Sequence, residues 1–325
     1  MTLKNKNVLV TGGAGFIGSH LVDRIIAREM PNKVIVLDNL FLGKMKNLED
    51  AKANCKNLKI YTFSLCDYEK TAKMIKDEKI NVVFNLAVVP LPVSLTKPKW
   101  AFDENVIMTQ NLCEMAREKM FETLIHFSSS EVYGTTIYSP MNEEHPLNPH
   151  TPYAASKASC DHLVYSYYKT YGIDMAILRP FNNYGPRQNE GNYAGVIPIT
   201  VKRLLSGARA IIHGDGLQTR DFIYVTDTAD AAIEIYNSMS TRGKTINIAS
   251  GKEVTIKRLV ETIIEQLKKE KINTEIKFEK EREGDVRRLI GDVRKATALI
   301  KFKPKVEFTD GIKNTVEWYK KNLKQ

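Results

Sequence analysis

Residues 8–20 read Val-Leu-Val-Thr-Gly-Gly-Ala-Gly-Phe-Ile-Gly-Ser-His, and this stretch decides the fold. An apolar run leads into three glycines spaced three apart, and apolar residues then recur at helical spacing as far as position 26. A strand, a glycine turn and a helix in this order are typical of a dinucleotide-binding unit. The glycines permit a tight turn, close approach of the pyrophosphate to the backbone, and close helix packing, and the helix N–H groups face the phosphates. We therefore predict that a dinucleotide is bound by Gly12, Gly15, Phe16, Ile17 and Gly18.

Asp38 indicates which dinucleotide is bound. It lies twenty residues beyond Gly18, at the end of the second apolar run. A carboxylate at this place can bind the adenosine ribose hydroxyls, and it repels the 2′-phosphate of NADP. The sequence therefore predicts NAD as the cofactor, although Lys44 follows nearby and weakens the electrostatic part of this argument.

The first half of the chain alternates apolar, β-branched runs with stretches of helical periodicity. Such alternation is typical of βαβ units, whose parallel strands are buried on both faces and are nearly continuous in apolar residues. We expect long helices at 100–119 and 153–170. The pattern predicts an α/β protein with a Rossmann-type, doubly wound parallel sheet. Its strands are expected at residues 8–11, 34–37, 58–63, 82–85, 124–127 and 175–178.

Beyond Arg179 the composition changes to loops rich in Asn, Gly and Pro, followed by helical patterns at 196–206 and 256–269. We interpret these segments as a smaller α/β lobe that binds the substrate. An apolar run at 245–249 predicts one more strand of the main sheet. The predicted domains are a cofactor-binding domain of residues 1–179, with about 218–250 returning to it, and a C-terminal lobe of 180–217 and 251–325.

Composition and charge are those of an ordinary globular enzyme. Of 325 residues, 43% are hydrophobic and 26% are charged, and the formal net charge is +10. The basic residues are scattered among acids, so we expect a solvated surface and no nucleic-acid partner. No apolar run reaches the ~18 residues of a membrane helix, and the first residues lack a signal-peptide pattern. The four cysteines have no metal-ligand spacing, so we predict a cytoplasmic protein with no metal and no membrane partner.

Tyr153 and Lys157 form a Y-x-x-x-K pair at the start of the helix expected at 153–170. Residues four apart lie on one helix face, so the ammonium can reach the ligand that the phenol contacts. The unperturbed pKa of a tyrosine is about 10, and a neighbouring cation favours the phenolate. The positive nicotinamide ring adds to this effect, so Tyr153 can act as a base near neutral pH. The pair therefore predicts a catalytic site beside the cofactor.

The fifth expected strand leads into Phe-Ser-Ser-Ser-Glu-Val-Tyr-Gly, residues 127–134. Ligands meet this fold at the carboxyl ends of its parallel strands. Three serines and a glutamate buried at that edge are costly unless they bind something polar. We therefore expect Ser129, Ser130 and Glu131 to face the reacting part of the substrate.

Five segments of the chain carry a family resemblance. They are T-G-G-A-G-F-I-G, S-S-S-E-V-Y-G, P-Y-A-A-S-K, R-P-F-N-N-Y-G-P-R and G-D-G-L-Q-T-R-D-F-I-Y-V-T-D, and they span almost the whole sequence. In this order they resemble the extended short-chain dehydrogenases/reductases, and more narrowly the NAD-dependent epimerases and dehydratases of sugar nucleotides. The resemblance implies that Ser129 binds the 4-oxygen of the sugar, that Tyr153 is the base, and that Lys157 binds the nicotinamide ribose.

The same resemblance implies the partners of this protein. They are a sugar nucleotide, most simply a UDP-sugar, and a second copy of the chain in a homodimer. A guanidinium group pairs with phosphate through two hydrogen bonds, which suits it to a diphosphate. The residues implied to bind the phosphates of the sugar nucleotide are Asn182, Arg220 and Arg282.

Two segments depart from the family pattern. The family often has Gly-Asp-x-x-Asp after the third strand, with the first Asp on the adenine, and Ser64 takes that place here. The loop at 85–94 is apolar, carries Pro90 and Pro92, and is one residue shorter than the pattern. It borders the expected sugar site. Further cofactor contacts are implied for Asn39, Ser64, Leu65, Leu86 and Ala87.

Glu131 discriminates between the reactions of the family. All members would begin with removal of the 4-hydroxyl proton by Tyr153 as a hydride passes from C4 to NAD. A carboxylate near C5 of the resulting 4-keto sugar can remove the C5 proton, and the 6-hydroxyl then leaves. An epimerase needs no such base, because it turns the ketone and returns the hydride to the other face.

The residue before this glutamate leaves the product open. Dehydratases that make 4-keto-6-deoxy sugars usually have Asp there, whereas this chain has Ser130. We therefore predict a sugar-nucleotide dehydratase, a lyase, for example one that converts UDP-N-acetylglucosamine to a 4-keto-6-deoxy or a 5,6-ene product. A UDP-hexose 4-epimerase and a UDP-glucuronate decarboxylase stay open as alternatives.

Overall fold

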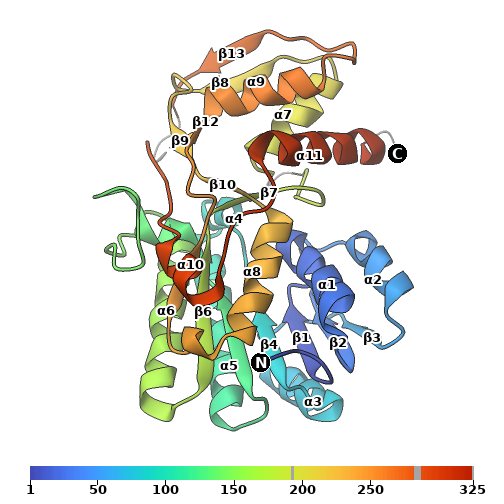
Figure 1. The fold of residues 1–325 in the computed structure, drawn as a ribbon, viewed down its shortest axis with the longest axis vertical. Helices are drawn as coiled ribbons and strands as arrows, with labels where there is room; N and C mark the ends of the chain where they lie inside the picture. The colour runs from blue at the N-terminus through green and yellow to red at the C-terminus, as the bar shows by residue number, and fades with distance from the viewer. Residues whose placement is uncertain (192–193, 282–286, 324–325) are drawn as a thin grey trace.

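The structure, a computed structural model, describes residues 1–191, 194–281 and 287–323, and it is built around one parallel sheet (Figure 1). Seven strands lie in the order β11-β6-β5-β4-β1-β2-β3, and each neighbouring pair is parallel. This is the doubly wound Rossmann order with a further strand at one edge, so the predicted fold class is confirmed. The strands are β1 (Asn7–Thr11), β2 (Lys33–Leu37), β3 (Leu58–Tyr61), β4 (Val82–Asn85), β5 (Thr123–Phe127), β6 (Asp174–Pro180) and β11 (Thr245–Ile248).

Helices cover both faces of this sheet. Their bounds follow the apolar periodicity of the sequence, and the two long helices expected at 100–119 and 153–170 are α5 and α6. The helices beside the sheet are α1 (Phe16–Glu29), α2 (Glu49–Asn54), α3 (Tyr68–Glu78), α4 (Leu91–Ser94), α5 (Pro98–Arg117), α6 (Pro152–Tyr171), α8 (Val225–Asn237) and α10 (Arg294–Ile300).

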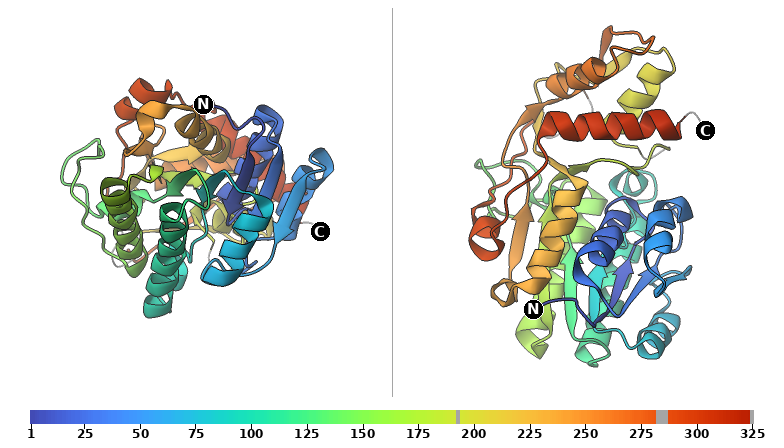
Figure 2. Two further views of the ribbon diagram at one scale, coloured as in Figure 1. Left: turned by 90° about the horizontal axis from the view of Figure 1, so that it is seen from below. Right: turned by 45° about the vertical axis from the view of Figure 1, so that its right-hand side comes forward.

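Alternation of side chains along the strands creates two separate cores. On β1, Val8 and Val10 pack on the face that carries α1 and α8, whereas Leu9 packs on the opposite face with α3, α5 and α6. Figure 2, seen from below, shows these helices as layers on either side of the sheet. Because both faces are covered, the strands are apolar almost throughout, which is why their positions could be predicted to within two residues.

A smaller lobe lies over the carboxyl edge of the sheet, at the top of Figure 1. Its core is formed by apolar residues of three helices packed on a parallel strand pair, β8 with β13. Two further strand pairs, β7 with β10 and β9 with β12, connect the lobe to the sheet. The elements of this part are β7 (Asn182–Tyr184), α7 (Val196–Leu205), β8 (Ala210–His213), β9 (Thr219–Arg220), β10 (Phe222–Tyr224), β12 (Val254–Thr255), α9 (Ile256–Gln266), β13 (Ile276–Glu279) and α11 (Phe308–Asn322).

The chain passes between the two parts several times. It returns to the sheet through α8 and β11, and the predicted strand at 245–249 pairs with β6. Ala296 of α10 and Phe302 also pack in the core beside α1 and α8, although the sequence assigned 251–325 to the lobe. Short-range patterns do not reveal this second return, because it depends on long-range packing. The domain boundaries themselves remain a proposal.

Among the described residues, no helix combines the length and the apolar character that crossing a bilayer requires.

Candidate active site

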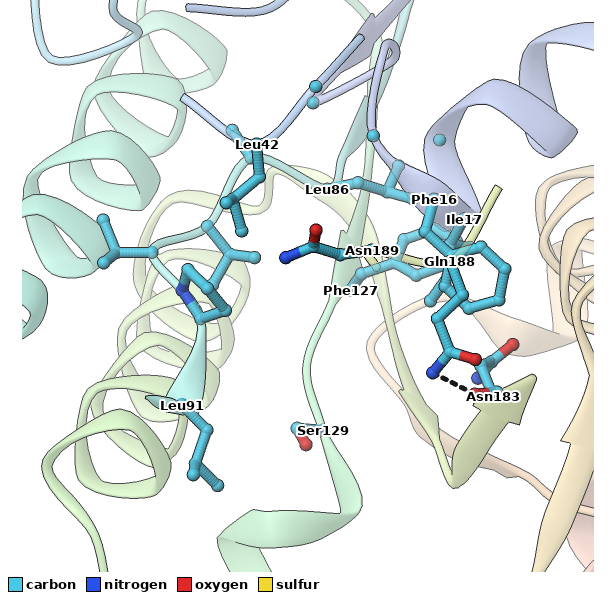
Figure 3. Close-up of a pocket in the computed structure, with 18 of the residues that line it drawn as sticks. Phe16, Ile17, Leu42, Leu86, Leu91, Phe127, Ser129, Asn183, Gln188 and Asn189 are labelled. Carbon is cyan, nitrogen blue, oxygen red and sulfur yellow. Dashed lines mark hydrogen bonds between the residues drawn. The ribbon is translucent and has the colours of Figure 1, made fainter. Parts of the chain in front are cut away.

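A cavity of about 540 Å³ opens at the carboxyl edge of the sheet, where the small lobe meets it. It is lined by the glycine turn before α1, the ends of β2, β4 and β5, the start of α6, and the loop after β7. Figure 3 shows Leu42 and Leu91 on one side of this cavity, Phe16 and Asn183 on the other, and Ser129 at the end of β5. The position is the one at which a doubly wound sheet binds ligands.

The glycine turn is too tight for side chains. Gly12 has a φ of +64°, and a Cβ there would lie 2.9 Å from the backbone N of Ala87. A Cβ on Gly18 would lie 2.2 Å from the carbonyl oxygen of Gly12. The turn therefore brings the N-terminus of α1 directly against the cavity, as a pyrophosphate requires.

Gly18→Ala is expected to weaken NAD binding by about tenfold or more and to destabilise the fold by about 2 kcal/mol. The reason is the backbone clash at Gly12, which α1 can relieve only by moving away from β1 and from the phosphates. NAD titration and urea denaturation measure the two effects. Gly191→Ala is the control, since within the part of the chain that the structure describes its Cβ would meet the Asn189 side chain at 3.4 Å and nothing nearer. Equal behaviour of the two variants would contradict this account of the turn.

Asp38 lines the cavity at the end of β2 and is 7% exposed. Its carboxylate accepts hydrogen bonds from the backbone N–H groups of Ala14 (2.9 Å) and Leu40 (2.8 Å). Burial raises the pKa of Asp38, and these N–H groups oppose the rise. Lys44, which weakened the argument for NAD, has its ammonium 2.6 Å from Glu190. Its charge is thus partnered, which strengthens the argument for NAD over NADP.

The other residues expected at the cofactor fall into two groups. Ser64 is not among the described residues that line the cavity, and its hydroxyl accepts a hydrogen bond from the N–H of Cys66 (3.2 Å). Its neighbours Phe63 and Leu65 face the cavity instead, so the adenine would meet apolar side chains. The expected cofactor residues that line the cavity are Gly12, Gly15, Phe16, Ile17, Gly18, Asp38, Asn39, Leu65, Leu86, Ala87, Tyr153 and Lys157.

Tyr153 and Lys157 occupy the first turns of α6 and both line the cavity. The helix begins there because Pro152 occupies its first turn and the Thr151 hydroxyl caps the N–H of Ala154 (3.1 Å). Burial raises the pKa of Tyr153 to about 12, and a hydrogen bond with the Ser129 side chain opposes the rise. In this environment the phenol needs nearby positive charge to act as a base.

Lys157, four residues beyond Tyr153 on the same helix, is a buried cation. Its side chain is 4% exposed, and the ammonium donates a hydrogen bond to the carbonyl oxygen of Phe127 at the end of β5. Burial lowers the pKa of Lys157, and the nearby Cys160 and Asp161 oppose this. The glycine cradle, the Asp38 carboxylate and this pair together fit NAD, whose positive nicotinamide would add to the charge beside Tyr153.

The serine–glutamate segment turns its side chains to the same cavity. Ser129 caps the short 3₁₀ turn Ser130–Tyr133, and its hydroxyl accepts the N–H of Glu131 (3.2 Å). Ser129, Ser130 and Glu131 all line the cavity. The charge of Glu131 raises the pKa of Tyr153.

The three expected phosphate ligands are not all at the cavity. Asn182 lines it, and the Asn182 backbone and side-chain N–H groups donate to the carbonyl oxygen of Asp221 (3.1 and 3.4 Å). Arg220 lies on β9, outside the described cavity lining, and donates to its neighbour's carbonyl oxygen at Thr219 (2.9 Å). Arg282 lies outside the described residues.

Arg187 lines the cavity and was not predicted from the sequence. Its guanidinium pairs with Asp23 on α1 (2.6 Å) and Asp50 on α2 (2.8 Å), which ties the loop after β7 to the cofactor domain. Gln188 and Asn189 of the same loop also line the cavity. The sequence contained a signal, since Arg187 ends the R-P-F-N-N-Y-G-P-R segment, but its partners are far away in the chain.

Across the described ranges, no three His, Cys, Asp or Glu side chains come together in an arrangement that could hold a metal ion.

Comparison with known proteins places the chain in a family. The family model described as GDP-mannose 4,6 dehydratase matches residues 9–315. A putative UDP-glucose 4-epimerase of Methanocaldococcus jannaschii is 38% identical, over 97% of this chain and 99% of the relative.

Two solved structures have nearly the same fold. A UDP-N-acetylglucosamine 4-epimerase from Methanobrevibacter ruminantium, in complex with UDP-N-acetylmuramic acid, is 39% identical with a TM-score of 0.90, over 98% of this chain and 99% of that one. The dTDP-glucose 4,6-dehydratase DesIV of Streptomyces venezuelae, with NAD bound, is 31% identical with a TM-score of 0.89, over 97% of each chain. The cofactor of the present protein is accordingly NAD, and its substrate is a sugar nucleotide. This protein therefore belongs to the GDP-mannose 4,6-dehydratase family, among the NAD-dependent sugar-nucleotide epimerases and dehydratases of the extended short-chain dehydrogenase/reductase type.

Proposed function

We propose that this protein is a sugar-nucleotide dehydratase that oxidises the sugar at C4, removes the C5 proton and eliminates the 6-hydroxyl. The observation that carries the proposal is the position of Glu131. Its carboxylate lines the same cavity as Tyr153 and lies close enough for its charge to raise the pKa of the phenol. Elimination needs a second base beside the one that takes the 4-hydroxyl proton, and epimerisation does not.

In the first step, Tyr153 takes the proton of the 4-hydroxyl, and Ser129 holds the 4-oxygen beside it. The Lys157 ammonium favours the phenolate form of Tyr153, because an adjacent positive charge lowers the pKa of a phenol. NAD, when bound, would accept the hydride from C4 and would give the hydride back later in the cycle. Asn182 and the loop of Arg187 to Asn189 are in position to orient the nucleotide part.

In the second step, Glu131 takes the C5 proton, which the 4-ketone has made acidic. The carboxyl groups on the described cavity lining are those of Asp38, Glu104 and Glu131. Asp38 lies at the ribose end, and Glu104 accepts a hydrogen bond from the Cys66 thiol (3.1 Å). Since Ser130 is a poor acid, we assign to the protonated Glu131 the transfer of this proton to the 6-oxygen. The C6–O bond then breaks, and the 6-hydroxyl leaves as water.

The positive charges of the cavity favour a neutral hexose over a uronic acid. Among the described lining residues the cations are Lys44, Lys157 and Arg187, and each is already engaged. Lys44 pairs with Glu190, Arg187 pairs with two aspartates, and Lys157 is anchored on a backbone carbonyl. A C6 carboxylate would meet none of them without breaking such a pair, which argues against decarboxylation. The sugar of UDP-N-acetylglucosamine is uncharged and therefore fits this cavity.

A UDP-hexose 4-epimerase is the second candidate, and Ser130 favours it. The side chain of Ser130 is 3% exposed and has no acidic proton to give to a departing hydroxyl. The neighbouring wall, from Val88 to Leu91, is apolar, so it supplies no acid either. If Glu131 serves only to orient the sugar, the 4-keto intermediate would be reduced again without elimination.

Incubation of the NAD-loaded protein with a panel of UDP-, dTDP- and GDP-sugars, followed by mass spectrometry, tests the proposal. We expect one substrate to lose the mass of one water molecule. Loss of carbon dioxide would instead establish a decarboxylase. An unchanged mass with a new sugar configuration by NMR would establish an epimerase, and either result would overturn the dehydratase.

We further propose a homodimer formed through α5 and α6. The large apolar side chains that these helices expose outside the described cavity lining, Ile107 and Tyr165, support this proposal. Sedimentation of the purified protein tests it.

A further inference from the structure

Asp161 is a buried carboxylate one helical turn beyond Lys157 on α6, and the proposed reaction does not use it directly. It is 3% exposed, and its Oδ2 accepts hydrogen bonds from Ser128 Oγ (2.8 Å) and Arg179 Nε (2.9 Å). Its Oδ1 has no hydrogen-bond partner among the described residues and lies 3.9 Å from His126 Nε2. Lys157 and Asp161 thus reach consecutive residues of the same segment, the carbonyl oxygen of Phe127 and the hydroxyl of Ser128.

Arg179 holds this carboxylate from β6. It is 5% exposed, it donates from Nη1 to the Tyr133 hydroxyl (3.0 Å), and its guanidinium lies 4.9 Å from the centre of the Tyr133 ring. The Tyr133 hydroxyl donates in turn to Asn247 Oδ1 on β11 (2.7 Å). Contacts from two strands of the sheet, β6 and β11, therefore fix the position of Asp161. The ion pair of Asp161 with Arg179 is almost fully buried.

The groups that face Tyr153 and Lys157 from each neighbouring element are few. His126 on β5 is uncharged at neutral pH, because burial holds its pKa well below the usual range. Burial raises the pKa of the Cys160 thiol on α6, and that of Tyr133, so both are uncharged at neutral pH, and Cys160 acts on Lys157 by its charge only after the thiol ionises at high pH. The carboxylates that act on the pair are then Glu131 and Asp161 for Tyr153, and Asp161 for Lys157, with Arg179 behind Asp161 on β6.

We propose that Asp161 is a positioning residue of the redox site, which keeps the buried ammonium of Lys157 charged and in place, and that Arg179 limits this effect. The inference rests on the proposed roles of Tyr153 and Lys157. Asp161 is not itself among the described lining residues, but its Oδ2 accepts a hydrogen bond from the lining residue Ser128, so it acts through its charge and through this contact.

The direction of the effect follows from the signs of the charges. A negative charge near both groups raises the pKa of Lys157 and that of Tyr153. Its removal by Asp161→Asn should therefore move the deprotonation of both groups to lower pH by about one pH unit. Arg179→Met removes a positive charge and should move both to higher pH. The double variant removes one charge of each sign and should return both close to the wild type.

The test is a pH titration of the NAD-loaded enzyme, followed by phenolate absorbance in the near ultraviolet. Subtraction of the same titration in a Tyr153→Phe background isolates the signal of Tyr153. We expect a lower midpoint for Asp161→Asn, a higher one for Arg179→Met and a near wild-type one for Asp161→Asn/Arg179→Met. The pH limits of kcat should move in the same directions, with the sugar nucleotide identified by mass spectrometry.

Asp230→Asn is the matched control. Asp230 is also a buried acid, it pairs with Arg24 (2.6 Å), and it lies on α8, on the other face of the sheet. Its loss should lower the melting temperature without moving the midpoint of Tyr153. Midpoints that are the same in wild type, Asp161→Asn and the double variant would overturn the proposal and leave Asp161 a purely structural residue.

The double variant keeps the test valid if either single variant unfolds, because it leaves no unpaired buried charge. In that case the surviving single variant is compared with the double variant: their Tyr153 midpoints should differ by about one pH unit, and equal midpoints would overturn the proposal. Failure of the proposed function is a separate result. It would be seen as full activity of Tyr153→Phe, whatever Asp161 does.

Discussion

Tyr153→Phe is expected to slow the oxidation at C4 by about 10³-fold while NAD stays bound. The substitution removes the one hydroxyl that can take the 4-hydroxyl proton and keeps the ring that fills the same space. Ser129 remains beside the substrate, but a serine hydroxyl is too weak a base to replace the phenolate. The measurement is the absorbance of the reduced cofactor in a single turnover, with NAD content checked after denaturation.

Tyr165→Phe is the control for this experiment. Tyr165 lies on the same helix, is 46% exposed and is outside the described cavity lining, so the loss of its hydroxyl should leave the rate of oxidation unchanged. A Tyr153→Phe enzyme that oxidises its substrate at the wild-type rate would contradict the assignment of the base. A loss of bound NAD in that variant would instead indicate that the phenol is needed to hold the cofactor.

Glu131→Gln is expected to retain NAD and the first oxidation but to lower overall turnover by about 10²- to 10⁴-fold. The amide keeps the shape of the side chain and cannot accept the C5 proton. The 4-keto intermediate should therefore accumulate together with the reduced cofactor, and a substrate deuterated at C5 should keep its label. Rapid quenching followed by mass spectrometry measures both.

This variant also separates the candidate reactions. An epimerase that uses Glu131 only to orient the sugar would lose at most about tenfold, since a single hydrogen bond contributes about 1 kcal/mol. Glu144→Gln is a suitable control, because Glu144 is an exposed acid on the loop that follows the 3₁₀ turn. Full dehydration by Glu131→Gln would contradict the proposed role of the carboxylate.

Several features of the site could be predicted because they are local in the chain. Gly12, Gly15 and Gly18 act within one turn, and Tyr153 and Lys157 share one helix face by spacing alone. Ser129 and Glu131 follow a strand whose apolar character is unmistakable. Each prediction needed only the direction of a strand or helix, and parallel strands bring all their carboxyl ends to one edge.

Other features could not be predicted because their partners are distant in the sequence. Arg187 meets Asp23 and Asp50, more than a hundred residues earlier, and only the packing of the lobe on the sheet brings them together. The expected contact of Ser64 with the cofactor could not be judged from its position in the sequence either. The loop turns the Ser64 hydroxyl to Cys66 and places the apolar neighbours of Ser64 at the cavity.

The sequence by itself determined the glycine turn, the parallel sheet, the preference for NAD and the tyrosine–lysine pair. These depend on backbone geometry and on spacing within single elements, which neighbouring residues specify. Only the tertiary structure decided which charges surround that pair and which cations of the cavity are already engaged. Electrostatic effects depend on distance in space and on burial, so Asp161, which the helix places near Lys157, meets Ser128 and Arg179 and becomes buried only when α6 packs against the sheet.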